Sequence, residues 1–168
     1  MKQKTFDDVQ KEIEGKPIVI ANRGIPARRI SRAISERLEG IPILTATDVD
    51  KTSPSTLGAY ELLLLGDDPN AYLDLELIIE KAKSRGAIGI HPGWGFISEN
   101  EDFPAKCAQA GITFIGPPTD AMKTLGNKVD VRQLAKKLDV PVVPGSEGSV
   151  TIEEARKIAH EIGFPIML

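Results

Sequence analysis

The hydrophobic positions of the chain alternate between short unbroken runs and runs with helical spacing. The unbroken runs at 17–22, 41–47, 87–90 and 112–116 are short and carry β-branched residues, as buried strands do. Between the first two, apolar residues recur every three to four positions, which predicts an amphipathic helix over 27–38. Strand, helix and strand joined by short links predict a parallel sheet with right-handed crossovers.

Two further segments extend this pattern on either side. Residues 5–14 open with Thr5 and carry Asp8 three positions later, a capping-box pattern that predicts a short leading helix. The segment ELLLLG at 61–66 fits a strand or a buried helical turn, and its periodicity does not separate the two.

Helical patterns then precede and follow the run at 87–90. Residues 70–86 predict a helix that Asn70 caps, and residues 103–111 predict a shorter helix before the run at 112–116. The whole alternation predicts the α/β class, with a Rossmann-like, doubly wound sheet.

The alternation of predicted strands and helices ends after residue 117. Residues 118–138 predict two helices, and the Pro/Gly-rich segment 141–149 predicts a connection. Thr151 and Glu154 form another capping-box pattern and predict one more helix. The apolar segment 163–168 predicts the first half of a strand with no partner, so we expect the chain to end inside a second domain.

Composition narrows the class of function. The 168 residues are 41% hydrophobic and 27% charged, with a net charge of −3, so no basic field points to nucleic acid or an anionic membrane. Cys107 is the only cysteine, which excludes an internal disulfide and a cysteine-based zinc site. The N-terminus has no apolar core of a signal peptide, and the longest apolar run, 62–65, is too short to span a bilayer. We therefore expect a cytoplasmic protein.

Two loops at predicted strand ends carry candidate chemistry. ANRG at 21–24 stands where a ligand binds in open α/β sheets, but it lacks the G-x-G-x-x-G spacing and fits a tight turn equally well. HPGWGFISEN offers an imidazole at His91, an indole at Trp94 and a carboxylate at Glu99. Alternatively, the aromatic residues of this loop plug the edge of the core, and His91 caps a strand end.

Charged residues elsewhere have two readings each. Lys128 stands near a predicted helix start, where an ammonium and the helix N-terminus attract the same phosphate, although most surface lysines bind none. The arginine-rich face of the helix over 27–38 is either solvated or an interface. Cys107 lies on a helical apolar face and packs there, and no nucleophile–base pair is evident.

The motifs IANRG, HPGWGFISEN, FIGPP and LGNKVDVRQLAKKLDVPVVPG occur in the order seen in biotin carboxylases, and the chain resembles that family from about residue 16 to its end. The leading helix at 1–15 precedes this resemblance, which implies a Rossmann-like pre-ATP-grasp domain at 16–128. Linker helices and the truncated start of an ATP-grasp lid follow at 129–168.

The resemblance also implies a reaction and its participants. A biotin carboxylase is an ATP-dependent ligase that carboxylates carrier-bound biotin with bicarbonate, through carboxyphosphate, with Mg²⁺ or Mn²⁺ at the phosphates. The implied partners are a biotin carboxyl carrier protein or domain, a carboxyltransferase subunit or domain, and a second copy in a homodimer; nucleic acid and membrane are not expected. The lid and the catalytic face lie beyond this piece, so we expect it to be inactive alone.

Individual roles follow from the same resemblance. Lys128 is the implied contact to the nucleotide phosphates, Trp94 and Gly95 border biotin, and Arg32 and Glu36 match the dimer contact. The remaining candidates orient the two loops: His91, Glu99, Asn22, Arg23 and Gly24.

One departure and three alternatives accompany this interpretation. Ile25-Pro26 replaces the Glu-Ile that is common in the family after the ANRG motif. The alternatives are a non-catalytic nucleotide-binding module, a structural dimerisation domain that uses Arg29 and Arg32, and an ATP-grasp ligase of the carbamoyl-phosphate type. HPGWGFISEN fits the last of these less well.

Overall fold

The computed structural model describes residues 4–57, 59–126 and 128–167, with only the backbone of Lys128. It divides into two compact units, Met1–Thr119 and Asp120–Leu168. The sequence predicts this boundary nine residues later, at 128. No helix among the described residues is long and apolar enough to cross a membrane.

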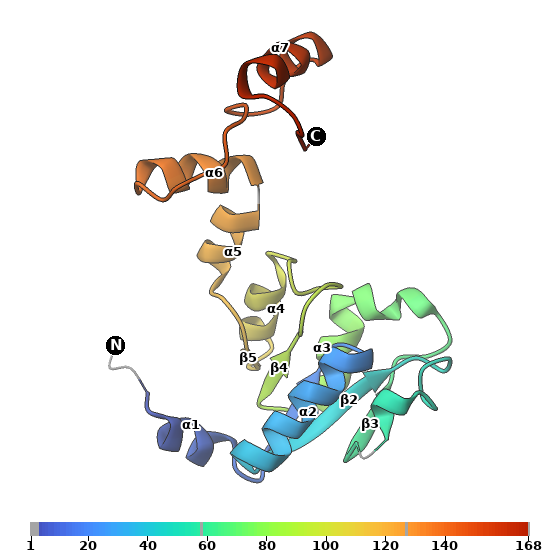
Figure 1. The fold of residues 1–168 in the computed structure, drawn as a ribbon. Coiled ribbons are helices and arrows are strands. Elements are labelled where there is room, and N and C mark those ends of the chain that lie inside the picture. The colour runs from blue at the N-terminus through green and yellow to red at the C-terminus, as the bar shows by residue number, and fades with distance from the viewer. Residues whose placement is uncertain (1–3, 58, 127, 168) are drawn as a thin grey trace. The chain divides into compact units, whose positions relative to one another are not determined.

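A parallel sheet forms the centre of the first unit (Figure 1). Its strand order is β3-β2-β1-β4-β5. The strands are β1 (Pro17–Ile20), β2 (Ile41–Ala46), β3 (Glu61–Leu64), β4 (Gly89–His91) and β5 (Thr113–Phe114). This confirms the predicted doubly wound α/β fold, and it settles the open segment at 61–66 as a strand.

Helices cover both faces of the sheet, and the alternation within β1 shows why. Ile18 and Ile20 point to one face, where they pack with α2 (Gly24–Leu38) and α1 (Phe6–Ile13). Val19 points to the other face, where α3 (Leu75–Ser84) and α4 (Phe103–Gln109) pack. A strand buried on both sides reads as a continuous apolar run, which is the pattern seen at 17–22.

The leading helix α1 contacts α2 beside Gly40. The box predicted at Thr5 is present, with the Thr5 hydroxyl accepting from the Asp8 N–H. A Cβ at Gly40 would lie 2.7 Å from a methyl group of Ile13 and 2.9 Å from one of Ile34. Glycine at this position therefore lets the chain return to the sheet directly beneath both helices.

The prediction that Asn70 caps a helix is wrong. Pro69–Leu73 form a 3₁₀ helix (η2) that Asp68 caps, and α3 begins only after Asp74, whose carboxylate accepts from the Leu77 N–H. A carboxylate at each of these starts satisfies the free N–H groups and leaves no capping position to Asn70. A further 3₁₀ turn, η1, spans Pro54–Thr56.

The second unit holds α6 (Lys128–Lys137) and α7 (Ile152–Ile162), with α5 (Thr119–Gly126) leading into it. The predicted capping box of Thr151 and Glu154 is present at α7. The prediction of a strand over 163–168 is wrong for the described residues 163–167, which form no strand. A strand needs a neighbour for its backbone groups, and none pairs with this segment in the described part of the chain.

Candidate functional site

The carboxyl ends of β1 and β4 lie side by side at the point where the strand order reverses. Ile20 pairs with His91, and the Ala21 N–H donates to the His91 carbonyl at 2.9 Å. The chain leaves β1 toward β2 and β3, and it leaves β4 in the opposite direction toward β5. Open α/β sheets bind ligands in the crevice at such a reversal.

Asn22 joins the two loops at this crevice. Its side chain is buried, and its Nδ2 donates to the carbonyl oxygens of Pro92 at 2.6 Å and Trp94 at 2.9 Å. Its Oδ1 accepts from the Arg23 N–H at 2.8 Å. All hydrogen-bonding atoms of this amide are thus used to fix the turn after β4 against the start of α2.

The turn after β4 comes so close to Asn22 that only glycine fits at position 93. Gly93 has φ +67°, and a Cβ there would lie 2.5 Å from the Asn22 Nδ2. The Gly93 N–H donates to the Nδ1 of His91 at 3.0 Å, which requires this nitrogen to be unprotonated. Burial lowers the pKa of His91 and so favours the neutral form that accepts this bond.

Arg23 extends from the same loop toward the segment after β2. Its Nη1 lies 3.1 Å from the Asp50 Oδ2, and its Cζ lies 5.7 Å from the ring centre of Tyr72 and 5.5 Å from that of Phe96. The two rings are 5.2 Å apart and tilted by 34°. We call these four residues, Arg23, Asp50, Tyr72 and Phe96, the Arg23 cluster.

The charges of the Arg23 cluster are stabilised by its hydrogen bonds. Burial opposes ionisation of Asp50, but hydrogen bonds from Arg23 and Tyr72 outweigh it and lower the pKa of this carboxyl. Burial, together with the neighbouring Asp50, raises the pKa of Tyr72 to about 12. The Tyr72 hydroxyl therefore remains a donor to Asp50, at 3.0 Å, throughout the neutral range.

The other predicted loop residues face solvent. Trp94 is 61% exposed, and no atom lies within 4 Å of the position that a Cβ of Gly95 would occupy. Glu99 is exposed, and its side chain has no hydrogen bond or ion pair with the described residues. Gly24 begins α2 with φ +64°. Trp94 and Gly95 are therefore both open to solvent.

The remaining candidates stand on other elements. Arg32 and Glu36 pair with each other on the exposed face of α2, with Nε and Oε1 2.9 Å apart. Lys128 is the first residue of α6, and its side chain lies outside the described part of the structure. Cys107 packs in the core as predicted, and burial raises the pKa of its thiol to about 11.

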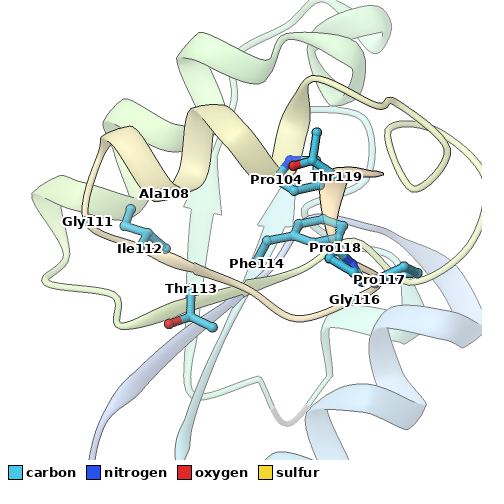
Figure 2. Close-up of a pocket in the computed structure, with 10 residues that line it drawn as sticks. All are labelled: Pro104, Ala108, Gly111, Ile112, Thr113, Phe114, Gly116, Pro117, Pro118 and Thr119. Carbon is cyan, nitrogen blue, oxygen red and sulfur yellow. The ribbon is translucent and has the colours of Figure 1, made fainter. Parts of the chain in front are cut away.

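A hollow of about 590 Å³ lies along β5 and α4 (Figure 2). Its walls come from α4, the turn after it, and the chain through β5 to Thr119. None of the lining side chains is titratable, so this groove offers no acid, base or nucleophile. Among the described residues, no group of three or more His, Cys, Asp or Glu side chains stands close enough to hold a metal ion.

Sequence reasoning missed two contributors to the site, Asp50 and Tyr72. Asp50 stands in the polar segment after β2, and this segment shares the carboxyl edge of the sheet with 21–24 and 92–96. This position at the carboxyl edge is the feature of the sequence from which Asp50 could have been predicted as part of the site. Tyr72 has no such feature, because it reaches the edge from a 3₁₀ helix that follows β3 in the chain.

The fold and the site define a doubly wound α/β domain whose loops after β1 and β4 meet at its switch point. Residues 14–122 match the family model described as "Biotin carboxylase, N-terminal domain", and residues 127–168 match "Carbamoyl-phosphate synthase L chain, ATP binding domain". The first match covers well over half of the chain. The chain therefore belongs to the biotin carboxylase N-terminal domain family.

Curated relatives agree with this assignment. The chain is 42% identical over 157 residues to a pyruvate carboxylase of Staphylococcus aureus, and 42% identical over 154 residues to biotin carboxylase 2 of Bacillus subtilis. These matches cover 91% and 90% of this chain. They cover only 14% and 34% of the relatives, so the chain spans a third or less of their length.

Solved structures share the fold as well. The biotin carboxylase domain dimer of the 2-oxoglutarate carboxylase from Hydrogenobacter thermophilus, in complex with MgADP, ADP and bicarbonate, has a TM-score of 0.79 at 39% identity. The match covers 89% of this chain and 33% of that one. The biotin carboxylase subunit of a pyruvate carboxylase has a TM-score of 0.73 at 40% identity, with coverages of 90% and 34%.

Proposed function

We propose that this chain supplies the N-terminal part of an ATP- and bicarbonate-dependent carboxylation of carrier-bound biotin. The observation that carries the proposal is the buried Asn22 amide, which holds the HPGWG turn at the switch point of a domain from the biotin carboxylase family. This arrangement presents Trp94 and Gly95 at the open side of the crevice, where we place the biotin ring.

In this proposal the described residues bind and orient rather than transfer protons. Asn22 and His91 fix the backbone of the turn, and Trp94 offers a flat apolar face to the ureido ring. Rigid placement of a reactant is a main contribution that a protein makes to the transfer of a carboxyl group. Glu99, exposed in the same loop, is placed to interact with a group that approaches from solvent.

We assign nucleotide binding to the second unit, with Lys128 as the phosphate contact. ADP, magnesium and bicarbonate are bound in the related 2-oxoglutarate carboxylase domain, and residues 127–168 match an ATP-binding domain. Lys128 begins α6, where an ammonium and free N–H groups attract the same anion. ATP, when bound, supplies the phosphoryl group that activates bicarbonate. No residue of this chain is assigned to Mg²⁺ or Mn²⁺, since the described residues form no ligand cluster.

We also propose partners. These are a biotin carboxyl carrier protein or domain, a carboxyltransferase, and a second copy of the protein that approaches the exposed face of α2 at Arg32 and Glu36. The related domain from Hydrogenobacter thermophilus is a dimer, which supports the last of these. The cytoplasm remains our expected compartment.

The test is a chimera in which this chain replaces the matching N-terminal segment of biotin carboxylase 2 of Bacillus subtilis. We expect the chimera to cleave ATP in a bicarbonate- and biotin-dependent manner, and the 168-residue chain alone to show no such cleavage. A folded chimera that binds ATP without biotin-dependent turnover would contradict the proposal and favour a nucleotide-binding module. Turnover by the chain alone would contradict the expected inactivity.

A further inference from the structure

The Arg23 cluster contains two residues, Asp50 and Tyr72, that the proposed function leaves without a role. We propose that both are positioning residues, which hold the Arg23 guanidinium against Phe96 and thereby fix the exposed turn at Trp94. The inference about the turn rests on geometry alone. Only its consequence for biotin rests on the proposed function.

Asp50 is held in place by three donors. Its carboxylate accepts from the Arg23 Nη1 at 3.1 Å, the Tyr72 Oη at 3.0 Å and the Thr47 Oγ1 at 3.3 Å. Its side chain is 18% exposed, whereas that of Arg23 is 50% exposed. The carboxylate is therefore the fixed member of the ion pair, and it determines where the longer arginine side chain lies.

Tyr72 anchors this arrangement to the core. The residue is 1% exposed, and its hydroxyl accepts from the Thr47 N–H at 3.3 Å while donating to Asp50. The ring also lies beneath Arg23, within reach of a cation–π contact. One buried side chain thus supports both charged residues of the cluster.

Phe96 depends on these contacts for its position. It has φ +48°, a left-handed conformation that is unfavourable for a non-glycine residue, and it is 40% exposed. Burial alone contributes little to holding such a ring. The contacts with Tyr72 and Arg23 supply the compensating attraction.

The turn is consequently held on both sides of Trp94. Asn22 binds the Trp94 carbonyl on one side, and Arg23 holds the Phe96 ring on the other. Gly95, between them, has φ +68° and open space around it. Release of Phe96 leaves a glycine hinge beside Trp94, so the indole moves relative to the crevice.

Trp94 is the only tryptophan of the chain, so its fluorescence reports this turn directly. We expect Asp50→Asn in the 168-residue chain to raise the population of the displaced turn about two- to fivefold, as loss of an exposed cation–π contact predicts. The measurement is the amplitude of the fast component of the Trp94 anisotropy decay, which reports local motion of the indole. Asp48→Asn is the matched control, because among the described residues the Asp48 carboxylate pairs with Lys51 alone, on the surface of the same segment.

A double variant separates positioning from general destabilisation. If Asp50 acts through Phe96, then Asp50→Asn adds nothing to the anisotropy change produced by Phe96→Leu alone. Additive effects, or an Asp50→Asn decay equal to that of Asp48→Asn, would overturn the inference. Should Asp50→Asn not fold, Tyr72→Phe keeps the ring and removes the hydroxyl with its bonds to Asp50 and Thr47, and the same comparison decides.

The consequence for biotin is tested in the chimera. Asp50→Asn is expected to raise KM for free biotin by the same two- to fivefold with little change in kcat, since a misplaced turn weakens binding. A changed Trp94 decay with unchanged KM would support the positioning role and contradict the placement of biotin at Trp94.

Discussion

Replacement of Asn22 by aspartate tests the central contact of the site with almost no change in shape. The variant Asn22→Asp keeps the oxygen that accepts from the Arg23 N–H, but it removes the NH₂ group that binds the carbonyl oxygens of Pro92 and Trp94. Two hydrogen bonds at about 1 kcal/mol each are lost. The buried Pro92 carbonyl then has no donor, at a cost of about 1–3 kcal/mol. We expect the variant to lose roughly 3–5 kcal/mol of the free energy of unfolding.

The introduced carboxyl adds a pH dependence of known sign. Burial and two facing carbonyl oxygens disfavour its ionised form, so its folded pKa lies above the unfolded value of about 3.9. The folded variant then binds more protons than the unfolded chain. Its destabilisation is smallest below about pH 4 and grows as the pH rises toward the folded pKa.

Urea unfolding followed by Trp94 fluorescence measures this change in the first unit. At a slope of about 1–3 kcal/mol per molar urea, a loss of 3 kcal/mol lowers the midpoint by about 1–3 M. Asn70→Asp is the matched control, since Asn70 is exposed and caps no helix. Equal midpoints for the two variants at pH 7 would refute the reasoning about Asn22.

Three other predictions concern single positions. Burial lowers the pKa of His91, so the wild-type chain loses stability as the pH falls below about 6.5 toward the folded pKa. His91→Asn keeps an acceptor for the Gly93 N–H. Urea unfolding should show that this variant loses less stability than the wild type between pH 7.5 and 5.5. Gly93→Ala should cost at least about 2 kcal/mol in that assay, clearly more than Gly95→Ala, where only the positive φ is unfavourable. Cys107, with its pKa raised to about 11, should react about 100-fold more slowly with a disulfide reagent at pH 8 than in urea; equal rates would contradict its burial.

The sheet was predictable because a strand buried on both faces has an unbroken run of apolar residues. Ile18 and Val19 pack on opposite faces, so no polar residue interrupts β1. Asn70 was misassigned because capping is decided by competition, and the carboxylates of Asp68 and Asp74 satisfy the neighbouring N–H groups. The prediction of a strand over 163–168 is wrong for the described residues, because apolar character gives no information about a pairing partner.

The site was predictable only in its location. Parallel strands bring the loops at 21–24 and 92–96 to one edge, and this follows from the alternation of elements. Across that edge, Asn22 bonds to two residues that follow it in the chain by 70 and by 72 positions. These bonds depend on Gly93 fitting against Asn22. Such fit depends on three-dimensional packing and has no periodic signature.

Asn22 and Arg23 illustrate how one dipeptide can organise the whole edge. Adjacent residues of extended backbone point in opposite directions, and Arg23 is still extended, with φ −133° and ψ 179°, before α2 begins. Asn22 consequently turns inward, to 1% exposure, and reaches the turn after β4, whereas the half-exposed Arg23 side chain reaches Asp50 after β2. Insertion of one residue between them would reverse one of the two directions and separate the loops, so the spacing matters as much as the residue types.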